Sequence, residues 1–354
     1  MSTALDNLLN RPLIEFLERT PLSWLKWDAE KQKIVMIVDN HLLSTYRACP
    51  QHFVYAHVHG YRRKGLAVGE SSRYWFLDFG ILVHKMLELY YQRFREPGFD
   101  ALMFFTERAS AEWTEKAMSV HSEHHEYKAL GGLPGFIALL AQYATVLSPQ
   151  NEKLRVLGTE VSFGKNLEVP LFISPEEEFY LAGRMDLIVD DGYFICPMDH
   201  KTMGVFKNDP GLKFETEEGP TGYIYALKTV LPQFLGEDEI LKRDCSKILM
   251  NLISKTATPL PQDRFRRIPI RKTEHQLMQY KDRMIVTCGH ILQDMKQVAD
   301  GCPVPRNTQV CQNWMHLQCP YFDVCRQYSR EAEQATLQNG FVQIKIWDTE
   351  AMES

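Results

Sequence analysis

Two strand-like segments joined by a tight turn limit most strongly what this chain can fold into. Residues 183–189 and 193–201 are rich in apolar side chains with strand-like alternation, and the residues DDG at 190–192 lie between them. Gly accepts a positive φ and Asp tolerates one, so this turn favours a hairpin with a two-residue loop at 191–192 or 190–191. The chain should therefore contain an antiparallel pair of strands with one apolar face.

Charged side chains gather on one face of this predicted hairpin. Either loop pairs residues whose numbers sum to an odd value, so Asp186, Asp199 and Lys201 project to the same side. Two converging carboxylates repel each other unless a cation lies between them, and a hard divalent ion such as Mg²⁺ or Mn²⁺ suits oxygen ligands. The alternative is a solvent-exposed strand face with an Arg184–Asp199 pair. The opposite face predicts a core made of Met185, Leu187, Val189, Phe194, Cys196 and Met198.

The period of the apolar residues changes near residue 150. Helical spacing predicts helices over 42–58 (with a break at Pro50), 73–95, 100–120 and 134–147. Strand patterns follow at 154–163, 178–189, 193–201 and 247–253, with helices at 221–231 and 274–298. These patterns predict a mixed α/β fold with a mainly helical part over 1–150, an α/β core over 151–300 and a Cys-rich tail over 301–354 that packs on the first part.

Composition indicates a globular protein. The 354 residues are 45% hydrophobic and 24% charged, which is enough for a substantial core. We expect a cytoplasmic protein without a membrane partner, because the sequence has neither a signal-peptide pattern at its start nor an uninterrupted apolar stretch of spanning length. The net charge of -5 does not indicate a nucleic-acid partner and does not exclude one, since a local basic surface matters more.

The order of the charged motifs resembles the active site of the PD-(D/E)XK nuclease superfamily, and most of all its RecB-like branch. The residues that carry the resemblance are Gly183-x-x-Asp186 and, across the hairpin, Asp199-x-Lys201. The branch also has a G-x-x-x-H motif on an upstream helix, matched here by Gly80 and His84. The resemblance implies a restriction-endonuclease-like mixed sheet flanked by helices, Mg²⁺ or Mn²⁺ held by His84, Asp186 and Asp199, and a catalytic Lys201.

Two further motifs of that branch have partial counterparts. A glutamate on the preceding strand corresponds to Glu160. A downstream Q-x-x-x-Y helix that contacts DNA corresponds to residues 219–223 or 221–225, and neither register keeps the glutamine. The resemblance therefore implies Glu160 and Tyr223 as accessory residues.

The cysteines carry a second resemblance. Cys311, Cys319 and Cys325 have seven and five residues between them and no C-x-x-C pair occurs, which disfavours structural zinc. Several RecB-like nucleases, including the AddB type and CRISPR adaptation exonucleases, bind a [4Fe-4S] cluster through one cysteine before the nuclease core and three after it. Cys49 with these three resembles that set, and Cys302 or His316 could replace Cys311. Ordinary buried cysteines are the alternative, which we assign to Cys196, Cys245 and Cys288.

A basic segment at 263–272 (DRFRRIPIRK) predicts a strand that could follow a nucleic-acid backbone. A solvated charged face is the alternative. The candidate DNA-binding residues are Arg264, Arg266, Arg267, Arg271 and Lys272.

The function implied by the resemblance is that of a metal-dependent DNA exonuclease in recombination, repair or phage replication, similar to phage recombination exonucleases. No G-x-x-x-x-G-K-[ST] loop is present, so a helicase, recombinase or annealing protein would be a separate partner. A non-catalytic nucleic-acid or partner-binding module that keeps the fold and the cluster is the alternative. The intact Asp199-x-Lys201 argues against that alternative.

Overall fold

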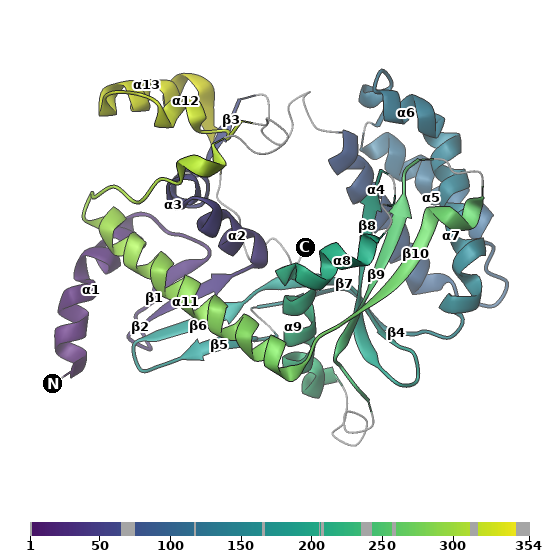
Figure 1. Cartoon of the computed structure of the whole chain (residues 1–354), viewed down its shortest axis with the longest axis horizontal. Coiled ribbons are helices and arrows are strands. Elements are labelled where there is room, and N and C mark those ends of the chain that lie inside the picture. The colour runs from purple at the N-terminus through teal and green to yellow at the C-terminus, as the bar shows by residue number, and fades with distance from the viewer. Residues whose placement is uncertain are drawn as a thin grey trace. The chain divides into compact units, whose positions relative to one another are not determined.

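Two units, each assembled from separate stretches of the chain, make up the fold. The first contains Met1–Glu70, Ser162–Gly183 and Met278–Ser354, and the second contains Ser71–Val161 and Arg184–Leu277. The computed structural model describes residues 2–64, 75–116, 118–164, 167–204, 206, 209–234, 243–256, 260–311 and 318–344. Most elements of both units are labelled in Figure 1.

A five-stranded mixed sheet forms the centre of the second unit, in the order β10-β9-β8-β7-β4. β7 and β8 are antiparallel, β8 and β9 are parallel, and β9 and β10 are antiparallel. The strands are β4 (Arg155–Phe163), β7 (Gly183–Asp190), β8 (Ile195–Met203), β9 (Lys247–Ser254) and β10 (Phe265–Arg271). The predicted mixed α/β fold is confirmed.

Helices cover both faces of this sheet, with α4 to α7 on one side and α8 and α9 on the other (Figure 1). The apolar hairpin residues Leu187, Val189, Cys196 and Met198 are buried in the α4–α7 cluster, as their alternation predicts. Met250 and Leu252 are buried on the α8–α9 side. The helices are α4 (Trp75–Arg93), α5 (Ala101–Glu115), α6 (His125–Leu130), α7 (Gly132–Asn151), α8 (Pro210–Thr216) and α9 (Glu218–Phe234), with 3-10 turns at Met118–His121 and Pro261–Arg264.

Within the described residues, α7 is the one helix long and apolar enough to cross a membrane. Phe136, Leu139 and Tyr143 of this helix are buried in the core of the second unit. One such helix is weak evidence for a span, because core helices have the same length and hydropathy.

The hairpin between β7 and β8 turns one residue later than the sequence predicts. Asp191 N–H bonds to the carbonyl of Phe194 at 3.1 Å, which leaves Gly192 and Tyr193 at the tip. The Asp191 carboxylate accepts from the backbone N–H groups of Tyr193 and Phe194 at 3.0 and 2.8 Å, so this aspartate closes the turn instead of lying in its loop. Gly192 has the positive φ of 93° that favours glycine. Paired residue numbers still sum to an odd value, so the predicted faces are unchanged.

One predicted strand is two strands in different sheets. The run 178–189 contains β6 (Glu177–Leu181) and β7, and Ala182 separates them. β6 belongs to a four-stranded sheet of the first unit, in the order β1-β2-β6-β5. The other strands of that sheet are β1 (Leu25–Asp28), β2 (Lys33–Val38) and β5 (Pro170–Ile173). The prediction of one strand was wrong because strand alternation does not reveal a change of sheet.

The predicted helix break at Pro50 is confirmed. α2 (Asn40–Ala48) ends before Cys49, which has an extended backbone, and α3 (Pro50–Phe53) begins with the proline at its first position. A π-helical segment, Val54–Val58, continues α3. The other helices of the first unit are α1 (Ser2–Arg19), most of α11 (Glu274–Ala299), α12 (Phe322–Cys325) and α13 (Arg330–Gly340), with a 3-10 turn at Thr308–Val310.

The C-terminal segment is joined to an early segment of the chain within the first unit. β11 (Phe341–Gln343) pairs antiparallel with β3 (Tyr61–Arg63). Tyr55, Tyr321 and Phe341 are buried together beside this pair, and Cys319 and Cys325 pack against the same cluster.

Candidate active site

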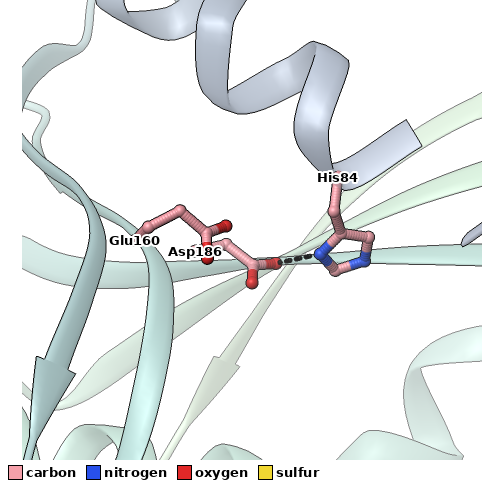
Figure 2. Close-up of side chains that lie close together, drawn as sticks. All are labelled: His84, Glu160 and Asp186. Carbon is pink, nitrogen blue, oxygen red and sulfur yellow. Dashed lines mark ion pairs between the residues drawn. The ribbon is translucent and has the colours of Figure 1, made fainter. Parts of the chain in front are cut away.

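Three side chains from three elements of the second unit converge on one point. His84 of α4, Glu160 of β4 and Asp186 of β7 each place a ligand atom within 4.8 Å of the others. Figure 2 shows the three side chains directed toward one another, with an ion pair of 3.3 Å between His84 Nδ1 and Asp186 Oδ2. One imidazole nitrogen and two carboxylate oxygens form a donor set that fits Mn²⁺ or Mg²⁺.

His84 and Asp186 each shift the pKa of the other. Burial opposes ionisation of Asp186, but the hydrogen bond and positive charge of His84 outweigh it and lower the Asp186 pKa. Burial also opposes protonation of His84, and Asp186 outweighs it and raises the His84 pKa. Without a cation the two side chains therefore favour an imidazolium–carboxylate pair. A divalent cation would take the place of the proton as the positive charge beside Asp186.

Glu160 occupies a strained backbone position. Its φ is 50°, and it is one of two non-glycine residues with positive φ in the described part of the chain. The left-handed region is costly for a residue with a Cβ, and such strain is found most often at functional sites. Glu160 Oε2 also lies 2.7 Å from Arg184 Nε, which positions the carboxylate. Burial raises the pKa of Glu160, and the positive charge of Arg184 opposes that rise.

Asp199 and Lys201 form an ion pair on β8, with 2.7 Å between Lys201 Nζ and Asp199 Oδ2. The Asp199 side chain is 5% exposed, whereas that of Lys201 is 44% exposed, so the ammonium is the accessible partner. Burial raises the pKa of Asp199 to about 6, Lys201 opposes this rise, and the negative charge of Asp186 adds to it. Asp199 is not in the three-residue group found among the described residues, which contains Glu160 instead.

The family model for the PD-(D/E)XK nuclease superfamily matches residues 42–326 of this sequence. The chain belongs to the PD-(D/E)XK nuclease superfamily. Among solved structures ten chains match, and one of them is described as "Crystal structure of SSO0001". That alignment has 14% identity and a TM-score of 0.24, and it covers 58% of this chain and 84% of the other. A search of curated proteins found no match.

The superfamily motif includes a residue between its aspartate and lysine, here His200, whose backbone contacts the site. The strand pairing of β7 and β8 runs from Asp190↔Ile195 to Leu187↔Met198. Beyond that pair, His200 N–H donates to Asp186 Oδ2 at 2.7 Å. The Asp186 side chain thus accepts a bond from β8 at the point where the strand pairing ends.

The His200 ring belongs to a buried polar network that sequence reasoning missed. Asn251 Nδ2 of β9 donates to His200 Nδ1 at 2.8 Å and to Tyr143 Oη at 2.7 Å. Burial lowers the His200 pKa to about 3, so the ring is neutral at pH 7. The network continues through Tyr91 to Arg267 of β10, whose Nη2 lies 3.0 Å from Tyr91 Oη.

The five candidate DNA-binding residues have two different environments. Arg264 and Lys272 are buried and donate to acceptors inside the second unit. Arg267 also donates inward, to Asn151 Oδ1 at 2.8 Å. The two whose side chains are exposed are Arg266 and Arg271. Tyr223 is half-buried on α9 and packs against the apolar cluster on the Asp199 side of the sheet.

Four cysteines approach one another in the first unit. Asn307 N–H donates to Cys49 Sγ at 3.4 Å, and the Asn307 carbonyl lies 3.9 Å from Cys311 Sγ. Cys319 N–H donates to the Cys311 carbonyl at 2.9 Å. The pKa of Cys325 is raised to about 11, mainly by burial, while the charge of Arg306 opposes the rise and the other three thiols add to it. These contacts place Cys49, Cys311 and Cys319 in one region, and Cys325 packs with Cys319 against the same apolar cluster.

The other four cysteines differ in solvent exposure. Cys196, Cys245 and Cys288 are buried, whereas Cys302 is exposed. His316, the other alternative to Cys311, lies outside the described residues.

Proposed function

We propose that this nuclease is a metal-dependent DNA exonuclease that acts in recombination, repair or phage replication. The observation that carries this proposal is the group His84, Glu160 and Asp186, with the Asp199–Lys201 pair on the neighbouring strand. A divalent cation bound there would activate water and neutralise charge on a phosphodiester.

The chain's own residues would divide the remaining work. Asp186 and Glu160 supply carboxylate ligands, and the His200 N–H and Arg184 hold those carboxylates in place. Burial opposes the charge of Lys201, but Asp199 outweighs it and raises the Lys201 pKa, so the ammonium stays protonated and can stabilise negative charge on the reacting phosphate. Asp199 also orients the Lys201 ammonium through the 2.7 Å ion pair.

We further propose that Cys49, Cys311, Cys319 and Cys325 hold a [4Fe-4S] cluster. Four thiols close enough to influence one another's ionisation support this assignment. When bound, the cluster would add to folding stability, as metal binding does elsewhere.

End-labelled single- and double-stranded DNA, incubated with the protein and Mn²⁺ or Mg²⁺, tests the activity. We expect shortening from an end, which EDTA stops. Lys201→Ala should abolish most cleavage under single-turnover conditions but retain Mn²⁺ binding, because the ammonium acts on the reacting phosphate and supplies no ligand. Equal cleavage by the variant would refute the role of Lys201. A wild-type protein that cuts no DNA would instead favour a non-catalytic binding module.

A further inference from the structure

We propose that Arg266 and Phe206 form a surface that holds single-stranded DNA beside Lys201. This inference rests on the proposed function, since it names the form of DNA that the same site receives. It concerns residues of the second unit only.

The two basic side chains share one face of the sheet. Lys201 pairs with Leu252 across β8 and β9, and Leu252 pairs with Arg266 across β9 and β10. Paired residues project to the same side, so Arg266 lies in the row of the catalytic lysine, on the α8–α9 side. Two strand spacings place their backbones about 10 Å apart. One DNA strand can therefore contact both.

Arg266 is held by an aromatic ring and has no ion-pair partner among the described residues. Its guanidinium lies over Phe206 with 5.1 Å to the ring centroid, and the Arg266 side chain is exposed. Phe206 is half-buried against the cluster that contains Leu252. A guanidinium stacked on a ring keeps its outward donors in a fixed arrangement for a phosphate.

The same pair favours a single strand over a duplex. A guanidinium on an aromatic ring offers a flat surface on which a nucleobase can stack. Bases in a duplex are stacked on each other and paired, so only an unpaired base can place its face there. The charge attracts the backbone, and the flat surface selects an open base.

Arg271 on the same strand provides a matched control. It is also exposed, and its guanidinium also lies over a phenylalanine, Phe194, at 5.0 Å from the ring centroid. The pairs of β9 and β10 place Arg271 opposite Lys247, in a different row from Lys201. Because Arg266 and Arg271 are five residues apart in β10, they project to opposite faces. The two arginines thus match in chemistry and differ in position.

Fluorescence anisotropy with a labelled single-stranded oligonucleotide in EDTA, where no cleavage occurs, tests the surface. Arg266→Ala should raise Kd about tenfold and lower the slope of log Kd against log salt by about 0.7, whereas Arg271→Ala should change neither. Phe206→Leu should raise Kd more for the normal oligonucleotide than for an abasic one, because only the normal strand also loses base stacking. In cleavage assays, Arg266→Ala should raise KM with little change in kcat.

Equal effects of the two arginine substitutions would overturn the proposal, as would a duplex competitor that displaces the oligonucleotide better than unlabelled single strand does. A wild-type protein that shows the predicted binding but cuts nothing with Mn²⁺ would refute the nuclease activity and uphold the binding surface. DNA cleavage by the wild type, together with an unchanged Kd for Arg266→Ala, would uphold the nuclease activity and refute the binding surface.

Discussion

The backbone N–H of His200 donates a hydrogen bond to Oδ2 of Asp186 at 2.7 Å. This bond joins the residue between Asp199 and Lys201 to the carboxylate on the adjacent strand. A shift of β8 along β7 would therefore move the ammonium of Lys201 and release a bond to Asp186 together. The geometry of the site depends on the register of this hairpin, which buried side chains fix on the other face.

The network behind His200 should affect cation binding. Asn251→Leu removes the amide bonded to His200 Nδ1, so His200 can shift together with the backbone N–H that holds the Asp186 carboxylate, and the loss of a group that orients a ligand typically lowers metal affinity about tenfold or more. Isothermal titration with Mn²⁺ measures the affinity. Tyr143→Phe is the control, because it removes the other acceptor of the same amide and leaves the His200 bond. It should cost about 1 kcal/mol of stability without changing Mn²⁺ affinity. Equal losses of affinity in both variants would contradict the positioning role.

Asp199 should make the stability of the metal-free protein depend on pH. Burial raises its pKa from 3.8 to about 6, so within this window the folded protein keeps a proton that the unfolded chain has lost. The free energy of unfolding should therefore fall as pH rises through the window, by at most about 3 kcal/mol. Asp199→Asn removes this contribution, so urea unfolding in EDTA between pH 4 and 7 should give a flatter profile. Parallel profiles for the variant and the wild type would show that Asp199 titrates normally.

Glu160 should combine metal binding with backbone strain. Glu160→Ala and Glu160→Gly both remove the carboxylate, so both should weaken Mn²⁺ binding. Glycine accepts the φ of 50° that alanine resists, so the glycine variant should be more stable than the alanine variant by about 1 kcal/mol without metal. Thermal unfolding in EDTA compares them. If alanine proves the more stable, the strain at this position is absent in solution.

The cysteine site should be visible by colour. Anaerobically purified protein should be brown, with broad absorbance near ~400 nm from thiolate-bound iron. Cys49→Ala should bleach it and lower the melting temperature, whereas Cys196→Ala, in the sheet core of the other unit, should keep both the colour and the iron content. Colourless protein with stoichiometric zinc would support structural zinc instead.

The shared face of Asp186 and Asp199 could be predicted because it does not depend on the exact position of the hairpin loop. The loop of the β7–β8 hairpin was placed one residue too early, yet the faces of Asp186 and Asp199 depend only on whether paired numbers sum to an odd value. Cys49 could be placed at a helix break because a proline follows it.

Other features depend on contacts that sequence patterns do not record. Arg267 resembles its exposed neighbours in the basic segment. Because it pairs with Asn251 across β9 and β10, its side chain points to the same face as Asn251 and joins the buried network. The positive φ of Glu160 could not be predicted, because glycine and asparagine are the residues that usually indicate such a backbone conformation. Alternation across 178–189 could not reveal that the chain leaves one sheet and enters another at Ala182.

The discontinuous units impose an order in time on the assembly of this protein. All five candidate active-site residues from His84 to Lys201 precede Cys311 in the chain, whereas Cys49 precedes them all. At a synthesis rate of 5–20 residues per second, about 13 to 50 s separate the appearance of Cys49 from that of its first proposed co-ligand. At the proposed cluster site, Cys49 would therefore be synthesised first and would lack its three co-ligands while the nuclease strands are made. Iron insertion at the proposed site is consequently a late event, one that follows synthesis of the complete catalytic sequence.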